Sequence, residues 1–332
     1  MDPSRLMRWL TSRVMSRVSR TASTEARHAK AERERIKAGA PHRVEYFHQV
    51  DEAYSALTAQ VLERLAQRYD IELHCHLVRG QEGKNAPEPE MLASLARYEA
   101  HLIAPGYGLC FPEHPDPPGP EHVAVATRIL AAQSREDFPR VVAAVSAALW
   151  QGDDTELHRL AVAHGSASAD AAAAAVSAGT SRRKALRHYS GAMFHYGGEW
   201  YWGVDRLYHL EMRLAALGAD RTPGESLIAP RPGTDLAGHT DQGRYTLELY
   251  ASLRSPYTAV IFDRTVAFAQ HAGVELKLRP VLPMVMRGVP ATREKGMYIF
   301  MDAAREARVA GVPYGNFYDP IGDPARRCYA LY

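Results

Sequence analysis

The chain contains two stretches of similar sequence: Leu247–Val281 reads LELYASLRSPYTAVIFDRTVAFAQHAGVELKLRPV, and Val44–Val78 reads VEYFHQVDEAYSALTAQVLERLAQRYDIELHCHLV. They align without a gap at a shift of about 203 residues, which still relates Gly108 to Gly311. A chance match would not keep one register over that distance. The sequence therefore predicts an internal duplication. Identical residues at this shift are Glu45 and Glu248, Ala56 and Ala259, Ala66-Gln67 and Ala269-Gln270, and Glu72-Leu73 and Glu275-Leu276.

Each stretch predicts a strand, a helix and a second strand. In the second copy, Tyr245–Tyr250 alternates and is rich in aromatic residues, as strands are. Ser255-Pro256 then begins a helix that runs from Tyr257 to His271, because proline fits the first turn of a helix, and Gly273 suits the helix end. Val274–Pro280 is the second strand. Two strands joined by such a helix form a right-handed βαβ unit with parallel strands.

The first copy continues with further helices, a hairpin and a last helix. Gly197-Gly198 predicts the turn of an antiparallel hairpin between Ala192–Tyr196 and Trp200–Trp202, and a helix follows from Asp205 to Leu217. This order is the plan of an α/β thioredoxin-like fold, and a helical insertion after the second strand is typical of DsbA-like proteins. The helices predicted in the insertion are Met91–Leu102, Val123–Gln133, Asp137–Leu149 and Ala171–Ser177.

These features divide the chain into four parts. Residues 1–40 are predicted to form a basic N-terminal helical arm, and residues 41–220 a first DsbA-like unit. Residues 221–243, rich in proline and glycine, form a linker. Residues 244–332 form the start of a second unit, which is incomplete because Tyr332 corresponds to Ile129 of the first copy. The second unit is either part of a longer sequence or completed by strands of another chain.

The composition is that of an ordinary globular protein. The chain has 332 residues, of which 46% are hydrophobic and 23% charged, enough for a sizeable core. A net charge of +2 gives no reason to expect nucleic acid as a partner, and no apolar run reaches the roughly 18 residues that span a membrane. The cysteines Cys75, Cys110 and Cys328 include no Cys-x-x-Cys pair, which argues against dithiol redox chemistry and for a reducing, cytoplasmic location.

One locally basic segment lies near the amino terminus. Leu6, Leu10, Val14 and Val18 recur at helical spacing, with arginines between them. Such a helix could make a weak contact with an anionic membrane surface. The interpretation that the sequence favours is that the helix packs its apolar stripe on the body of the protein or on a second subunit of a homodimer, as helices of globular proteins do. The arginines are Arg5, Arg8, Arg13, Arg17 and Arg20.

Three motifs resemble one known family. Ser255-Pro256-Tyr257-Thr258, directly after a predicted strand, is similar to the Ser-Pro-Tyr-Ser signature of kappa-class glutathione transferases and 2-hydroxychromene-2-carboxylate isomerases. The segment Gly198–Leu207 resembles the terminal segment of that family. A third motif resembles its Lys, Tyr and Asp-x-x-Arg helix, and consists of Lys295, Tyr298, Asp302 and Arg305.

The resemblance implies a glutathione-dependent isomerase or transferase that acts on a small aromatic acid. Ser255 would be the catalytic residue, donating a hydrogen bond to the glutathione thiolate, which the positive end of the helix dipole also stabilises. Lys295 would bind a carboxylate of glutathione, and Asp302 would orient that lysine or pair with Arg305. The residues implied in binding the cofactor are Pro256, Tyr257, Lys295, Asp302 and Arg305.

The same residues also have structural interpretations. Ser-Pro is a common helix cap, and Asp302 with Arg305 can be a solvated pair worth under about 1 kcal/mol. His74 and His76 alternate on a predicted strand but have no carboxylate at ligand spacing, so no metal site is predicted. The alternative to an enzyme is a non-catalytic, tandem thioredoxin-like binding protein.

The first copy lacks the motif. Glu52, Ala53, Tyr54 and Ser55 stand where Ser, Pro, Tyr and Ser would be, and Ala192 stands where the family has a cis-proline. Residues other than proline are strongly disfavoured in cis peptides, so we expect a different backbone at Ala192. The first unit is therefore predicted to be a degenerate, non-catalytic copy.

Overall fold

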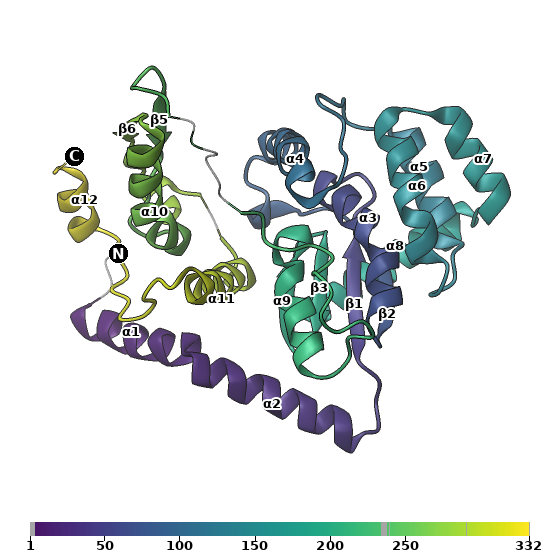
Figure 1. The fold of residues 1–332 in the computed structure, drawn as a ribbon, viewed down its shortest axis with the longest axis horizontal. Coiled ribbons are helices and arrows are strands. Elements are labelled where there is room, and N and C mark those ends of the chain that lie inside the picture. The colour runs from purple at the N-terminus through teal and green to yellow at the C-terminus, as the bar shows by residue number, and fades with distance from the viewer. Residues whose placement is uncertain (1–3, 234–237, 239, 290, 332) are drawn as a thin grey trace. The chain divides into compact units, whose positions relative to one another are not determined.

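The protein is described by a computed structural model that covers residues 4–233, 238, 240–289 and 291–331. The chain divides into two compact units (Figure 1). We call residues 30–232 the first unit, and residues 1–29 together with 233–332 the second unit.

The first unit is built on a four-stranded sheet with the strand order β2-β1-β3-β4. β1 and β2 are parallel and joined by α3, whereas β3 and β4 form an antiparallel hairpin. The hairpin turn is Gly197-Gly198, and both residues have positive φ, which glycine adopts without a steric penalty. Strand order and connectivity confirm the predicted α/β thioredoxin-like fold. The bounds are β1 Arg43–His48, α3 Ala53–Arg68, β2 Glu72–Leu77, β3 Met193–Tyr196, β4 Glu199–Trp202 and α9 Gly203–Ala216.

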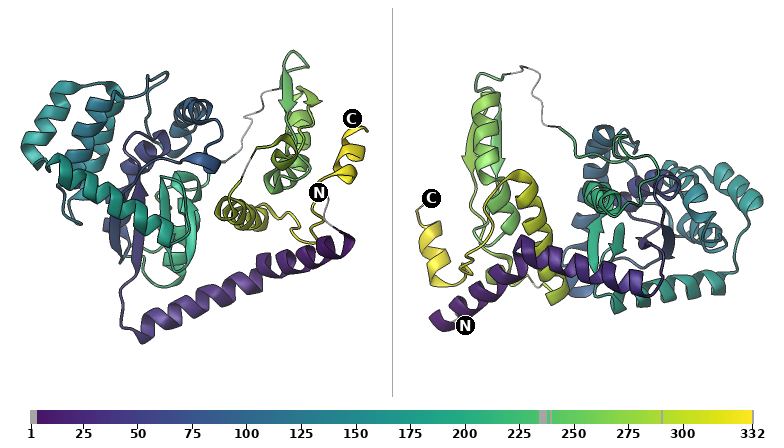
Figure 2. Two further views of the ribbon diagram at one scale, coloured as in Figure 1. Left: turned by 180° about the vertical axis from the view of Figure 1, so that it is seen from behind. Right: turned by 60° about the horizontal axis from the view of Figure 1, so that its bottom comes forward.

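A helical insertion joins β2 to β3, and its last helix, α8, packs on β2. α8 lies across the strands on one face (Figure 2), so close to β2 that a Cβ on Gly179 would lie 2.1 Å from the Leu77 carbonyl oxygen. Only glycine permits this approach. Four of these helices match the predicted ones, whereas α7 was not predicted, because its polar sequence lacks a strong apolar period. The bounds are α4 Pro89–Ile103, α5 Pro120–Ala131, α6 Phe138–Gln151, α7 Asp154–His164 and α8 Ala169–Ala185.

β1 is the buried centre of the first unit. Successive side chains alternate between the two faces of the sheet. Tyr46 points toward α3 and donates a hydrogen bond to the Ser55 carbonyl, whereas Glu45 points toward α8 and pairs with Arg182 at 2.6 Å. Tyr46 and Phe47 are fully buried, so both faces of this strand are covered.

Part of the predicted linker packs on the first unit. The Glu211 carboxylate of α9 accepts hydrogen bonds from the backbone N–H groups of Ile228 and Ala229, at 2.7 and 3.1 Å. Arg68 pairs with Asp220 at 3.0 Å. Because these bonds satisfy buried polar groups, residues up to 229 of this segment are held against the body of the unit.

The second unit contains a two-stranded parallel sheet, β5 and β6, joined by α10. Among the described residues, β5 pairs with β6 alone, and its side chains are at best half-buried. α2 (Thr21–Lys37) begins in this unit and ends in the first one. The other bounds are α1 Arg5–Ser19, β5 Thr246–Leu249, α10 Pro256–Ala272, β6 Glu275–Leu278, α11 Arg293–Ala310 and α12 Asp323–Tyr329.

The two parallel strand pairs have corresponding registers. Arg43 lies opposite Glu72, and Thr246 lies opposite Glu275, which is the same pairing moved by about 203 residues. The backbone hydrogen bonds that follow the strands correspond at the same shift: Val78 N–H donates to the His48 carbonyl at 2.9 Å, and Val281 N–H to the Ala251 carbonyl at 2.8 Å.

α1 is attached to the second unit by polar contacts. The Arg8 guanidinium donates hydrogen bonds to the carbonyl oxygens of Asp319 and Ile321, the latter at 3.0 Å. The Ser16 hydroxyl accepts a hydrogen bond from the Asn316 N–H at 3.0 Å. In the part of the chain that the structure describes, neither α1 nor any other helix is long and apolar enough to cross a membrane.

Buried histidines should make the first unit sensitive to acid. Burial lowers the pKa of His48 to about 3, because a charged imidazole in the core would lose its hydration. His188 and His195 have pKa values lowered to about 3 and about 4, also mainly by burial. The unfolded chain binds these protons below about pH 6.5 whereas the folded unit does not. The folded unit is therefore most stable, with respect to these histidines, above pH 6.5, and its unfolding free energy decreases as the pH falls toward 3.

We expect His48→Leu to reduce this acid sensitivity. Between pH 7 and pH 4.5 the wild-type unit should lose about 2–3 kcal/mol of unfolding free energy through His48 alone, and the variant should not. Urea unfolding at the two pH values, followed by tryptophan fluorescence, measures the difference. His114→Leu, at an exposed histidine, is the control. An equal pH dependence in wild type and His48→Leu would contradict the assignment.

Candidate functional site

Ser255 caps the amino end of α10. Its backbone is extended, with φ −78° and ψ 118°, and its Oγ accepts a hydrogen bond from the Thr258 N–H at 3.3 Å. Pro256 occupies the first helical position, as the sequence predicts. The Ser255 side chain is only half-buried. Its hydroxyl proton has no acceptor within the described parts of the chain, so it can donate to a ligand placed at the helix end.

Tyr257, Asp302 and Arg305 form one hydrogen-bonded network. The Tyr257 hydroxyl donates to Oδ2 of Asp302 at 2.7 Å, and Nη2 of Arg305 donates to Oδ1 at 2.5 Å. Asp302 and Arg305 are buried at 2% and 6% exposure. Asp302 therefore has both carboxylate oxygens engaged inside the protein, and any effect on a ligand would pass through Tyr257 or Arg305.

Lys295 lies on the same helix as Asp302, two turns before it, so both residues are on one face of α11. Its backbone N–H donates to the hydroxyl of Thr292, which caps the helix, at 3.2 Å. The side chain is half-buried, and burial lowers the pKa of Lys295 below its ordinary value. Five of the six predicted site residues thus lie in the first turn of α10 or in α11. The sixth, Ser255, immediately precedes α10.

The first unit has Glu52 at the position that corresponds to Ser255. Glu52 caps α3, and its Oε2 accepts a hydrogen bond from the Ser55 N–H at 2.7 Å. Burial raises the pKa of Glu52 to about 7, although the hydrogen bonds from Ser55 act in the opposite direction. Its side chain still reaches the surface in part. A carboxylate here would repel a bound thiolate, which agrees with the predicted loss of the motif.

A tyrosine–carboxylate bond occurs at corresponding positions of both units. Tyr54 of α3 donates a hydrogen bond to Oε2 of Glu99 on α4, as Tyr257 of α10 does to Asp302 on α11. Tyr54 also meets the edge of Trp202, with ring centroids 5.8 Å apart. In each unit the bond ties the first turn of the central helix to the next helix. The sequence resemblance identified Tyr257 and Asp302 as site residues but did not predict the hydrogen bond between them.

Ala192 adopts a left-handed backbone with φ +52° and is completely buried. Its N–H donates to the Ser55 hydroxyl at 3.1 Å, and its carbonyl accepts from the Gly203 N–H at 2.7 Å. These bonds hold a conformation that is costly for a residue with a Cβ. The loop beside Glu52 is thus closed onto α3.

The histidines of β2 are paired with carboxylates. His74 lies 3.2 Å from Glu72, and His76 lies 3.1 Å from Glu45. Burial would raise the pKa of Glu45, but the hydrogen bonds from Arg182 and His76 hold it well below its ordinary value. Within the described ranges, no three His, Cys, Asp or Glu side chains gather as metal ligands do.

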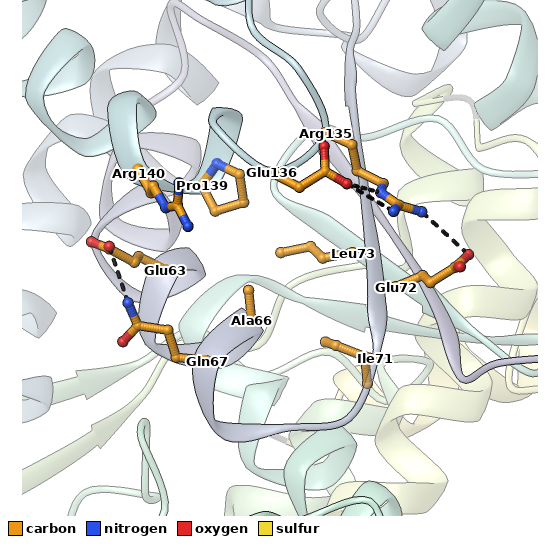
Figure 3. Close-up of a pocket in the computed structure, with 10 residues that line it drawn as sticks. All are labelled: Glu63, Ala66, Gln67, Ile71, Glu72, Leu73, Arg135, Glu136, Pro139 and Arg140. Carbon is orange, nitrogen blue, oxygen red and sulfur yellow. Dashed lines mark hydrogen bonds and ion pairs between the residues drawn. The ribbon is translucent and has the colours of Figure 1, made fainter.

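A cavity of about 250 Å³ lies in the first unit, beside the carboxyl end of α3 (Figure 3). It is at the opposite end of α3 from Glu52. Arg135 pairs there with Glu136 at 2.8 Å and with Glu72 at 3.4 Å. This cavity could not be predicted from the sequence, because its lining comes from three separate segments. It is smaller than most ligand pockets and does not form part of the site around Ser255.

Comparisons with known proteins found similarity to solved structures at low sequence identity. No protein-family model and no curated protein matches it. A solved 2-hydroxychromene-2-carboxylate isomerase is similar at 16% identity and a TM-score of 0.41, over 53% of this chain and 96% of the isomerase. A probable DsbA oxidoreductase from Streptomyces coelicolor is similar at 15% identity and a TM-score of 0.39, over 56% and 94% of the two chains. The assignment of the class, a thioredoxin-like fold with a DsbA-like helical insertion, rests on the strand order and connectivity of the first unit.

The Tyr257–Asp302 bond should stabilise α11 more than its counterpart stabilises α4. We expect Tyr257→Phe to lower the opening free energy of α11 by about 1.5–3 kcal/mol, because a buried carboxylate loses a donor. Tyr54→Phe is the matched control and should cost under about 1 kcal/mol at α4, because Glu99 is exposed and water replaces the tyrosine. Amide hydrogen exchange of the two helices measures both values. Equal losses would show that the burial of Asp302 adds nothing.

Proposed function

We propose that the chain binds glutathione at the amino end of α10 and acts as a glutathione-dependent isomerase or transferase on a small aromatic acid. The observation that carries this proposal is the Ser255 hydroxyl, which caps a helix of 17 residues and has a proton available to donate. A helix of this length presents a positive dipole end and unsatisfied N–H groups to whatever lies before it. That environment favours a thiolate over a thiol.

The residues around Ser255 fit glutathione by charge and by hydrogen bonding. When bound, glutathione supplies a thiolate nucleophile that is recovered unchanged at the end of an isomerisation. Ser255 donates a hydrogen bond to the sulfur and is not itself the nucleophile. Lys295 provides a cation for a glutathione carboxylate. Asp302 and Arg305 act as positioning residues, because their network holds Tyr257 and with it the first turn of α10.

We further propose that the two units arose by duplication and that the first unit is non-catalytic. The corresponding strand registers and the shared tyrosine–carboxylate bond support the duplication. Glu52 in place of Ser255, and the loop closed by Ala192, support the loss of activity in the first unit. A cytoplasmic location follows from the need for reduced glutathione.

The second candidate function is that of a non-catalytic binding protein with a tandem thioredoxin-like architecture. Two observations favour it: Ser255 Oγ already accepts a bond from its own helix, and Asp302 has both oxygens engaged inside the protein. Retention on immobilised glutathione separates the two functions. The enzyme should be retained and should lose retention in Lys295→Ala, whereas the binding protein should not be retained in either form.

Substitution of Ser255 should raise the pKa of the bound thiol. We expect Ser255→Ala to raise it by one to two pH units, because one hydrogen bond to a charged group is worth about 1.5–3 kcal/mol. Ser255→Asp keeps the helix cap but adds a negative charge, so it should raise the thiol pKa at least as far while α10 stays stable. Ultraviolet absorbance of the thiolate, titrated with pH in the protein–glutathione complex, measures the shift.

Ser252→Ala is the control for both variants, because Ser252 lies in the same loop but does not cap the helix. It should leave the thiol pKa unchanged. A bound thiol with the pKa of free glutathione in the wild-type protein would refute the catalytic proposal, and so would an equal shift in all three variants.

A further inference from the structure

α1 exposes its apolar side to solvent. Ordinary surface helices bury the apolar face and expose the polar one. Here Arg8 and Ser19 are buried, whereas the apolar residues on the opposite side are exposed. We call these residues the apolar stripe: Leu6, Leu10 and Val14 are 64%, 43% and 58% exposed, and Met7 and Trp9 at its edges are 55% and 54% exposed.

The attachment of α1 prevents the helix from rotating to bury this stripe. Two carbonyl oxygens, of Asp319 and Ile321, accept hydrogen bonds from the buried Arg8 guanidinium. Nη1 of Arg308 donates to the Ser19 carbonyl at 3.4 Å. Rotation of the helix would break these hydrogen bonds, which hold the polar side of α1 against the second unit. The orientation is therefore a stable property of the second unit.

Exposed cations accompany the stripe. The sequence of α1, RLMRWLTSRVMSRVS, has four arginines and no acidic residue. Arg13 and Arg17 are exposed, and Arg20 follows the helix. The guanidinium of Arg13 lies over the ring of Trp9, 5.4 Å from its centroid. One side of α1 thus combines aliphatic side chains, a tryptophan and exposed arginines.

We propose that α1 lies flat in the interface of an anionic lipid bilayer, with the apolar stripe among the upper acyl chains. Tryptophan is enriched at that depth, and arginines bind anionic head groups. A helix of 15 residues is about 22 Å long, too short to span the hydrocarbon core but suited to lie along it. The proposal concerns the location of the protein and does not depend on the glutathione site.

Charge favours a lipid surface over a second copy of α1. Two apolar stripes placed face to face would bring the exposed arginines of both helices together with no acidic residue of α1 between them. Repulsion between the arginines of the two helices would destabilise this dimer. An anionic bilayer supplies the opposite charge, and the mechanism is that of known interfacial helices.

Co-sedimentation of the full chain with lipid vesicles tests the proposal. We expect binding to vesicles of phosphatidylcholine with phosphatidylserine and much weaker binding to phosphatidylcholine alone. The triple variant Leu6→Gln, Leu10→Gln and Val14→Gln should bind at least about tenfold more weakly. The matched control is Met91→Gln, Leu95→Gln and Leu102→Gln, which removes three exposed apolar side chains from α4 and should bind as the wild type does.

Two further measurements separate the contributions of charge and insertion. Arg13→Gln and Arg17→Gln should each weaken binding to anionic vesicles about fivefold and leave binding to neutral vesicles unchanged. The fluorescence of Trp9, obtained as the difference between wild type and Trp9→Phe, should shift to the blue on binding. The proposal is overturned if the wild type does not bind, or if it binds neutral and anionic vesicles equally. It is also overturned if sedimentation shows a dimer that only the stripe variant loses, because the stripe then faces a second copy.

Discussion

Strand β1 lies between two partners, and the architecture of the first unit depends on that placement. β2 pairs with β1 along Arg43–His48 and β3 pairs with it along Glu45–Phe47, while α3 and α8 cover the two faces, so the strand is buried from Val44 to His48. β5 has the corresponding position in the second unit but, among the described residues, pairs with β6 only. A two-stranded sheet buries little and is marginal by itself. The second unit therefore relies on contacts of α10 with α11.

The charge of the capping side chain separates the two helix ends that could bind a ligand. Around Glu52 the loop at Ala192 is bonded to Ser55, and burial raises the pKa of the carboxyl group. Ser255 is half-buried, as Glu52 is, but its capping hydroxyl carries no charge. Both helix ends carry the same dipole. They differ in the charge of the capping side chain, and an uncharged hydroxyl is compatible with an anionic sulfur.

In the Tyr257–Asp302–Arg305 network, one hydrogen bond was predicted from the sequence and the other was not. Spacing on a helix predicts that Asp302 and Arg305 can pair, and they do, at 2.5 Å. The sequence could not show that Tyr257, 45 residues earlier, takes the other oxygen of Asp302. This bond depends on how α10 packs against α11. Asp302, predicted to bind the cofactor, is therefore buried, and its carboxylate accepts hydrogen bonds from side chains of the protein.

Local sequence patterns were sufficient to predict the βαβ segments, the helical insertion apart from α7, the glycine turn of the hairpin and the helix cap at Ser255. These features depend on local periodicity and on the backbone preferences of glycine and proline, which act within a few residues. Three features could not be predicted from local patterns: which face of α1 is attached, the burial of Asp302, and the positive φ of Ala192, whose N–H donates to Ser55. Each of these depends on hydrogen bonds between residues far apart in the chain, and the amphipathic pattern of α1 alone would have placed its apolar stripe inside.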